Sequence, residues 1–323
     1  MAGISYGTPY VPPAPPVPLL RGLKLLWRGP GKDAPEWDLT APQEGLGIVR
    51  EGVEGLSFPA YQHIVQESPA LAGQWHRGSR AKARRVFWPL CIWADASSDA
   101  WAVRDAAFWA SLGDTLEPGQ TGTWTVVTPA GSRRHLACRF EDDGGHAFSH
   151  DPFQKGWEVY GIAMAADGPY WASDPISQAW GASASRAFLP SAPGEPYWVT
   201  SGSLLGAASI TNPGDVPAWP RWTVVGGSTS VSAGVGGSVV EIPFPVPHGK
   251  AVVVDTDPRA QTAKYGDWDE ATRTLSNAVD RTRELGAADF APVPAGQNLP
   301  LSIAITGGGS VTAEITPLHR KAW

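Results

Sequence analysis

The sequence has few cysteines and no surplus of basic residues, and each shortage excludes a class of protein. Its two cysteines, Cys91 and Cys138, lack the paired spacing of a zinc site, so we expect two core thiols. A count of 25 basic against 31 acidic residues gives a net charge of −6, which leaves no basic field for nucleic acid. No run of about 18 apolar residues occurs, and no basic segment precedes an apolar one at the N-terminus. We therefore expect no membrane span, no signal peptide, and assembly in a cytoplasm.

Aromatic and turn-forming residues are abundant instead. The 323 residues include 16 Trp, 37 Gly and 31 Pro, and 42 % of them are hydrophobic. At about 100–200 residues per domain this length predicts two domains, and the composition predicts a folded, turn-rich chain. Because Trp is frequent at binding hot spots, the Trp count also indicates surfaces that are buried against partners.

Residues 1–22 are predicted to form a Pro-rich N-terminal arm. Six prolines lie between positions 9 and 18, where they favour an extended polyproline conformation with few backbone donors. We interpret the arm as a tether, and the alternative is a ligand for a proline-binding domain.

Residues 23–180 are predicted to form the first domain, which consists mainly of short strands. Residues 85–93 are apolar on both faces, as in a central strand, although Pro89 marks a bulge or an edge within the run. The runs 123–128 and 133–140 flank a turn and predict a β-hairpin. Further short strands are expected at 23–27, 47–50, 63–66 and 157–166.

One helix is expected in this domain, over residues 99–112. Ser97, Ser98 and Asp99 offer an N-cap, apolar residues then recur on one helical face, and Gly113 supplies a C-terminal stop.

Residues 181–196 are small, Pro-containing and aperiodic, so we place an interdomain linker there. Beyond it, residues 197–323 carry short candidate strands at a spacing of about ten residues, which predicts a β-sandwich. Residues 268–285 also fit a helix, because acidic residues come early and basic residues late. The expected strands of this domain are 197–200, 208–211, 222–225, 239–242, 251–255, 301–306 and 311–316.

Two histidines give the clearest candidate for a metal site. His146 and His150 lie four residues apart with Asp151 beside them, a spacing that holds a divalent metal on a helix. Gly144 and Gly145 disfavour a helix there, so we expect a polar loop.

The other polar and glycine-rich segments are interpreted as structural. Residues 226–237 and 307–309 lack the Lys followed by Ser or Thr that ends a phosphate-binding loop, and they are expected to be hairpin loops. Asp142 and Asp143 are adjacent, so on a strand they point apart, and a solvated turn explains them. The basic stretch 76–85 predicts a solvated loop or a protein contact, with a nucleic-acid surface as the alternative. No constellation for a nucleophile is present, so we predict no enzyme, no cofactor and no metal.

The segment Asn212-Pro213-Gly214-Asp215 predicts a rigid corner between two strands. Asn starts a turn, Pro fixes φ at the second position, and Gly takes a positive φ at the third, as in a type II turn. The corner is structural by this reasoning and indicates no ligand.

With the residues that follow it, this corner resembles the NPGD-x-P-x-aromatic-P-x-aromatic-T pattern in distal tail proteins of long, flexible-tailed bacteriophages. Further segments resemble that family in the same order, and the resemblance covers residues 45–323. Those segments are GVEGL at 52–56, the strand at 85–92, LGDTLEPG at 112–119, TWTVVTPAGSRRHLACRF at 123–140, GPYW at 168–171, VDTDPR at 254–259 and FAPVPAGQN at 290–298.

The resemblance implies a mainly β protein. Its N-terminal domain would be a β-sandwich or split barrel related to tail-tube subunits, with one helix, and its C-terminal domain a galectin-like β-sandwich. It implies a non-enzymatic virion protein at the tail tip, a homohexameric ring that joins the tail tube to the adsorption apparatus. The expected partners are the tail tube protein, the tape measure protein and tail-associated hub or fibre proteins, and phage DNA would pass without specific binding. The net negative charge predicts that the arginines of 77–85 lie away from the lumen.

Two other function classes stay open. The C-terminal sandwich would bind host cell-wall glycans if exposed Trp rings stack on sugars, and Trp198, Trp219 and Trp222 are the residues to locate first. A cell-wall hydrolase would need an acid with a raised pKa in a cleft, and no spacing in the sequence nominates one.

Overall fold

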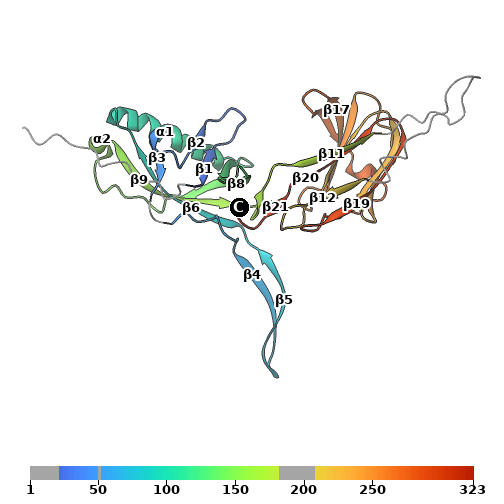
Figure 1. The fold of residues 1–323 in the computed structure, drawn as a ribbon, viewed down its shortest axis with the longest axis horizontal. Helices are drawn as coiled ribbons and strands as arrows, with labels where there is room; N and C mark the ends of the chain where they lie inside the picture. Colours follow the sequence, from blue (N-terminus) through green and yellow to red (C-terminus); the bar gives the residue numbers. More distant parts are fainter. Residues whose placement is uncertain (1–21, 50–51, 182–207) are drawn as a thin grey trace, which may run out of the picture. The chain divides into compact units, whose positions relative to one another are not determined.

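The structure, a computed structural model, describes residues 22–49, 52–181 and 208–323, and it confirms a mainly β protein (Figure 1). The chain divides into two compact units, one of residues up to Ala172 together with Arg320–Trp323, the other of Ser173–His319. The second unit therefore begins earlier than the predicted linker at 181–196, because β11 (Ile176–Gly181) pairs with β20 (Ser310–Ile315) of the second unit. Residues 182–196 and the arm up to residue 21 lie outside the described residues.

The first unit is built on one strongly curved antiparallel sheet, whose strands follow the order β2-β1-β7-β8-β9-β6-β3. The two ends of this order approach each other: the Ile48 amide of β3 donates to the Leu39 carbonyl, and the Leu39 amide donates to the Leu25 carbonyl of β1. These bonds nearly close the sheet into a barrel, as the split-barrel prediction requires. The strands of this unit are β1 (Lys24–Arg28), β2 (Glu36–Asp38), β3 (Leu46–Ile48), β4 (Tyr61–Ser68), β5 (Leu71–Ala81), β6 (Arg84–Trp93), β7 (Gly122–Val127), β8 (Arg133–Asp142), β9 (Trp157–Ala166) and β10 (Trp171–Ala172).

Strand β6 is a central strand without a bulge, although it contains Pro89. It pairs with β9 in continuous register along its whole length and with β3 over Leu90–Ile92. The Pro89 carbonyl accepts from the Val49 amide. In an antiparallel strand the nitrogen and the carbonyl of one residue point to the same neighbour, so the Pro89 nitrogen also faces β3, at the point where β3 ends. The missing donor therefore falls at a local edge, which is the second of the two predicted explanations.

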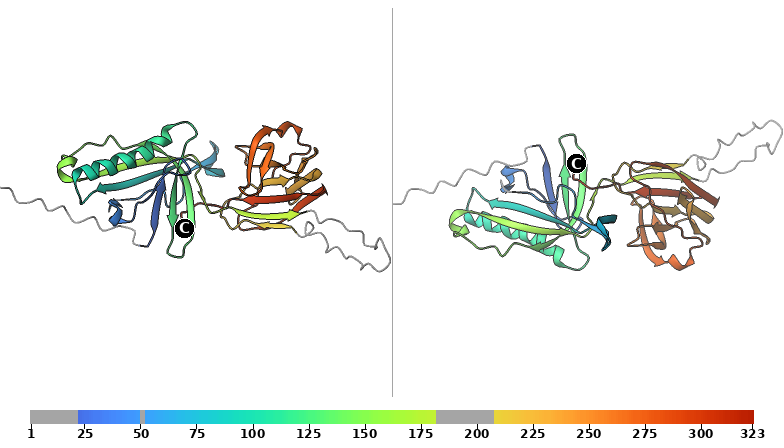
Figure 2. Two further views of the ribbon diagram at one scale, coloured as in Figure 1. Left: turned by 90° about the horizontal axis from the view of Figure 1, so that it is seen from above. Right: turned by 90° about the horizontal axis from the view of Figure 1, so that it is seen from below.

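The predicted helix is confirmed as α1 (Ser98–Gly113), which lies along one face of the sheet (Figure 2). The Ser97 hydroxyl accepts from the Ala100 amide at 3.1 Å, as an N-cap does. Gly113 is not a left-handed stop, because its φ is −57° and the chain continues into the 3-10 turn η2 (Asp114–Leu116). Within the described part of the chain, the remaining short helices are η1 (Pro42–Glu44), α2 (Pro152–Lys155) and η4 (Thr282–Glu284). Among the described residues, no helix combines the length and apolar character that a membrane crossing requires.

Tryptophan fills the core of the first unit. Trp27, Trp88, Trp124 and Trp171 are fully buried and follow one another in edge-on or tilted contact, with ring centroids 5.3, 5.5 and 4.9 Å apart. Such aromatic pairs stabilise a core beyond their buried area. These tryptophans therefore pack in the core. The number of Trp residues is thus weaker evidence for partner surfaces than the composition alone indicated.

The second unit is a β-sandwich whose two sheets share one core. The six-stranded sheet has the order β11-β20-β13-β16-β17-β18, and the four-stranded sheet has the order β12-β19-β14-β15. Buried residues such as Trp222 and Val311 of the first sheet belong to the same cluster as Val231 and Leu301 of the second. The additional strands are β12 (Ser209–Thr211), β13 (Arg221–Val225), β14 (Ser228–Val235), β15 (Ser238–Ile242), β16 (Lys250–Asp255), β17 (Thr262–Asp269), β18 (Thr274–Asp280), β19 (Asn298–Gly307) and β21 (Leu318–His319).

One local prediction in this unit is wrong, and one alternative is excluded. Residues 228–235 form strand β14 instead of a hairpin loop, because Val231, Ala233 and Val235 alternate into the core between small polar residues. Residues 268–285 form the end of β17, a turn, β18 and the 3-10 turn η4, which excludes the alternative of one helix over the whole range. The glycines 307–309 do form the predicted turn, between β19 and β20.

Candidate functional site

The corner at Asn212 is a buried hydrogen-bonding centre. The Asn212 side chain is fully buried; its amide group donates to the carbonyls of Val216 at 2.9 Å and Val293 at 3.0 Å, and its oxygen accepts from the Gly214 amide at 2.9 Å. Gly214 does not have a positive φ, so the predicted type II turn is wrong. Glycine is needed there for space, because a Cβ would lie 2.6 Å from the Leu318 carbonyl oxygen.

The two histidines of the metal hypothesis converge on a buried acid. Their Nε2 atoms lie 3.7 Å (His146) and 3.6 Å (His150) from the carboxylate of Glu158, which is 3 % exposed. His150 Nε2 is also 3.1 Å from the Trp157 carbonyl, which only accepts, so that nitrogen carries a hydrogen and has no lone pair for a metal. Asp151 is elsewhere engaged, because it caps α2. No group of three potential ligands that could hold a metal occurs among the described residues.

A second carboxylate, Asp105 of α1, lies in the same part of the first unit. Tyr160 and Trp109 donate hydrogen bonds to it, and burial raises its pKa despite these bonds. Burial is also the main cause of the raised pKa of Tyr160. These interactions connect α1, which carries Asp105 and Trp109, to β9, which carries Tyr160.

The cysteines and the paired aspartates are structural, as expected. Both thiols are free and buried, and burial raises the pKa of Cys91 to about 12. Asp142 and Asp143 each accept the backbone amide two residues ahead, as in a solvated turn.

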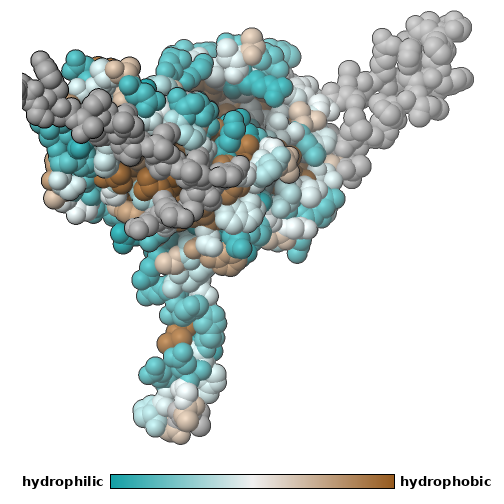
Figure 3. Space-filling view, turned by 60° about the vertical axis from the view of Figure 1, so that its left-hand side comes forward, coloured by the Kyte–Doolittle hydropathy of each residue, from teal (hydrophilic) through white to brown (hydrophobic). Residues whose placement is uncertain are grey.

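The basic stretch 76–85 runs along the second half of β5 and into the start of β6, so its interpretation as a loop is wrong, and the alternative of a protein contact stays a prediction. The long hairpin of β4 and β5 projects away from the rest of the first unit (Figure 1), and the two strands form a separate two-stranded sheet. Ile64 and Trp75 are about half exposed on it, at 54 % and 49 %. Figure 3 shows hydrophobic surface along this otherwise polar projection.

Arg84, at the base of this hairpin, is the exception within the basic stretch. It is 2 % exposed, and its guanidinium donates to the carbonyls of Gly55, Ser57, Pro169 and Arg320. Burial lowers its pKa to about 10. Arg84 thus ties the hairpin base and the chain's last residues to the barrel.

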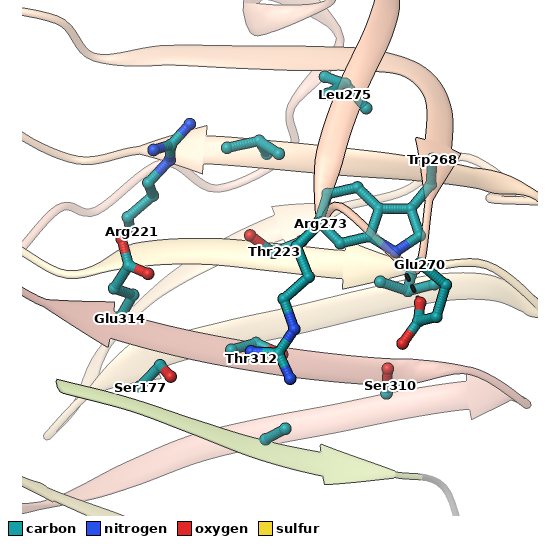
Figure 4. A pocket seen from close by; sticks show the side chains of 13 residues that line it. Ser177, Arg221, Thr223, Trp268, Glu270, Arg273, Leu275, Ser310, Thr312 and Glu314 are labelled. Carbon is teal, nitrogen blue, oxygen red and sulfur yellow. Dashed lines mark hydrogen bonds between the residues drawn. The ribbon is translucent and has the colours of Figure 1, made fainter. Parts of the chain in front are cut away.

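The second unit carries a polar hollow of about 330 Å³ on the solvent face of its six-stranded sheet (Figure 4). Sequence reasoning did not find it. Of the three nominated tryptophans, Trp222 is buried in the core, Trp219 is half-buried, and Trp198 lies outside the described residues. The tryptophan that lines the hollow is Trp268. We call this surface the sheet hollow and define it by Arg221, Thr223, Trp268, Arg273, Thr312 and Glu314.

The chain has the fold of hub proteins from phage tails. The SPP1 Dit (gp 19.1) protein, described as a paradigm of the hub adsorption apparatus in phages that infect Gram-positive bacteria, matches with a TM-score of 0.57 and 12 % identity over 92 % of this chain and 98 % of that chain. A chain of the phage P2 baseplate, activated with Ca, matches with a TM-score of 0.52 and 10 % identity over 91 % of this chain and 98 % of that chain. A chain of the same baseplate activated with Sr matches with a TM-score of 0.52 and 11 % identity over 91 % of this chain and 97 % of that chain. No family model and no curated protein matches the sequence.

Proposed function

We propose that this protein is the distal tail hub of a long-tailed bacteriophage. In this proposal six copies close into a ring at the tail tip, which joins the tail tube to the adsorption apparatus and leaves a channel for DNA. The role is structural and not enzymatic. The partners are the tail tube protein, the tape measure protein and the hub or fibre proteins of the tip.

The extent of the fold match supports a hub over a generic β-protein. Both units take part, because the match covers 92 % of this chain and 98 % of the SPP1 hub chain. A single sandwich or barrel domain with an unrelated role would match over one unit only.

The β4–β5 hairpin carries the argument for a ring. A two-stranded hairpin is at best marginally stable in water unless something packs against it. Most of its side chains are exposed, among them Ile64, Val65 and Trp75, and neither strand has a partner on its outer edge among the described residues. Unpaired edges and exposed apolar side chains are features that a neighbouring chain covers. In a closed ring each hairpin would lie on the next copy, in a head-to-tail contact.

The test is the mass of the purified full chain and of matched surface variants. Six copies of 34.2 kDa give about 205 kDa by light scattering. The double variant Ile64→Ser/Trp75→Ser should shift the mass toward one chain, because it removes apolar contacts without touching the barrel core. Val103→Ser is the control, since Val103 is 73 % exposed on α1, away from the hairpin.

A wild-type mass of one chain would contradict the ring. A double variant that keeps the wild-type mass would contradict the role of the hairpin.

A further inference from the structure

The sheet hollow presents its side chains by the alternation of two neighbouring strands. In β13 and β20, Trp222, Val224, Val311 and Ala313 point into the core and are at most 2 % exposed. The residues between them therefore face solvent. Cross-strand register places Arg221 opposite Glu314 and Thr223 opposite Thr312. One face thus builds the core, and the other displays two charges and two hydroxyl groups side by side.

The end of β17 and the turn that follows it complete the hollow with Trp268 of the strand and Glu270 and Arg273 of the turn. The indole N–H of Trp268 donates to the Glu270 carboxylate at 2.7 Å, so the ring's one polar atom is satisfied within the chain, and the half-buried ring lines the hollow. The Asp269 carboxylate accepts the amides of Ala271 and Thr272 at 2.9 and 3.3 Å, which fixes the turn. Figure 4 shows the three side chains on the same side of the sheet as Thr223 and Thr312.

Arg273 is held in an unfavourable backbone conformation. Its φ is +52°, a region that glycine adopts freely and an arginine does not. Folding alone would be served as well or better by glycine at this position of the turn. An arginine there is consistent with a use for its side chain, which lines the hollow.

The chemistry of the lining restricts the ligand. Two guanidinium groups, of Arg221 and Arg273, stand with two carboxylates, of Glu270 and Glu314, so the hollow has no net charge to select an anion or a cation. Hydroxyl, guanidinium and carboxylate groups together both donate and accept hydrogen bonds, as a polyhydroxylated ligand does. An indole face packs on the C–H face of a sugar ring. The volume lies at the lower end of the range of about 300–1,000 Å³ for small-molecule sites.

We propose that the sheet hollow binds a neutral saccharide, with Trp268 packed on one sugar ring and Arg221, Arg273 and the two carboxylates bonded to its hydroxyl groups. This inference goes beyond the ring and does not depend on it, because the hollow lies wholly within the second unit.

The experiment is a calorimetric titration of the full-length protein with defined oligosaccharides. The probes are neutral di- to tetrasaccharides of glucose, galactose, mannose and N-acetylglucosamine, and sialyllactose as the anionic comparison. Wild type should bind at least one neutral member. Trp268→Ala and Arg273→Gly should each weaken that binding at least tenfold. Arg273→Gly removes the side chain while keeping the backbone conformation without strain, so its thermal midpoint should equal or exceed that of wild type.

Gln261→Gly is the matched control. Gln261 also has a positive φ, of +44°, and is exposed, but it lies outside the hollow, so this variant should bind as wild type does. Failure of every neutral probe to bind, binding of sialyllactose alone, or binding that survives both hollow variants would overturn the proposal. The light-scattering mass of the same samples reports on the ring separately, so loss of one property is distinguishable from loss of the other.

Discussion

Replacement of Asn212 by Ala should destabilise the second unit selectively. The substitution removes two buried donor bonds, to Val216 and Val293, and leaves the Gly214 amide without its acceptor. A buried hydrogen bond contributes about 1 kcal/mol net, and a buried polar group left unpaired costs about 1–3 kcal/mol. We expect the free energy of unfolding of the second unit to fall by about 2–4 kcal/mol. The loss stays below the sum of the separate costs because some of the unpaired groups become hydrated.

Native-state hydrogen exchange read by mass spectrometry resolves the two units. Because each 1.4 kcal/mol is a factor of ten, peptides from β13 and β16 should exchange about 30- to 1,000-fold faster in Asn212→Ala. Peptides from β6 and β9 of the first unit should be unchanged. Asn298→Ala is the control, because Asn298 is exposed and accepts one bond, from Thr211. Exchange in β13 and β16 within threefold of that control would refute the reasoning about the corner.

Four further predictions follow from burial, close packing and charge. Since burial raises the folded pKa of Asp105, the folded state binds the proton more tightly than the unfolded state, so stability falls as pH rises above the ordinary carboxyl range; Asp105→Asn should flatten this dependence in urea unfolding at pH 4 and pH 7. Cys91 and Cys138 should resist a thiol reagent at pH 8 in the native protein and react fully in denaturant, and fast native labelling would contradict their burial. Gly122→Ala should destabilise the first unit by about 1–3 kcal/mol in thermal unfolding, because its Cβ would lie 2.1 Å from the Trp27 ring, whereas Gly78→Ala meets nothing and should be near neutral. If the proposed ring forms, it should bind DNA weakly; tight binding that weakens steeply with salt, together with a map that shows arginines of 77–85 on the channel wall, would contradict this expectation.

Local patterns were sufficient for the elements whose own residues define them. The helix α1 carries its cap at Ser97 and a recurring apolar face, and β9 coincides with the predicted strand 157–166. The Asn212 corner was recognised as structural, but its geometry was not. Glycine is required at position 214 because the backbone of Leu318, about a hundred residues later, leaves no room for a Cβ atom. A local turn type does not explain it.

Long-range pairing accounts for most of what sequence reasoning missed. Strand β11 belongs to the second unit because it pairs with β20, whose sequence gives no sign of that partner. The sheet hollow joins side chains of β13, β20, the end of β17 and the β17–β18 turn, which only the sheet register brings together. The Trp content was ambiguous for the same reason, because composition does not tell a packed core from an exposed surface.

Electron microscopy of the purified full-length protein tests the central proposal most directly. We expect closed rings with six-fold symmetry, an open centre, and each β4–β5 hairpin in contact with the neighbouring copy. Single chains, or closed assemblies with a different symmetry, would contradict it.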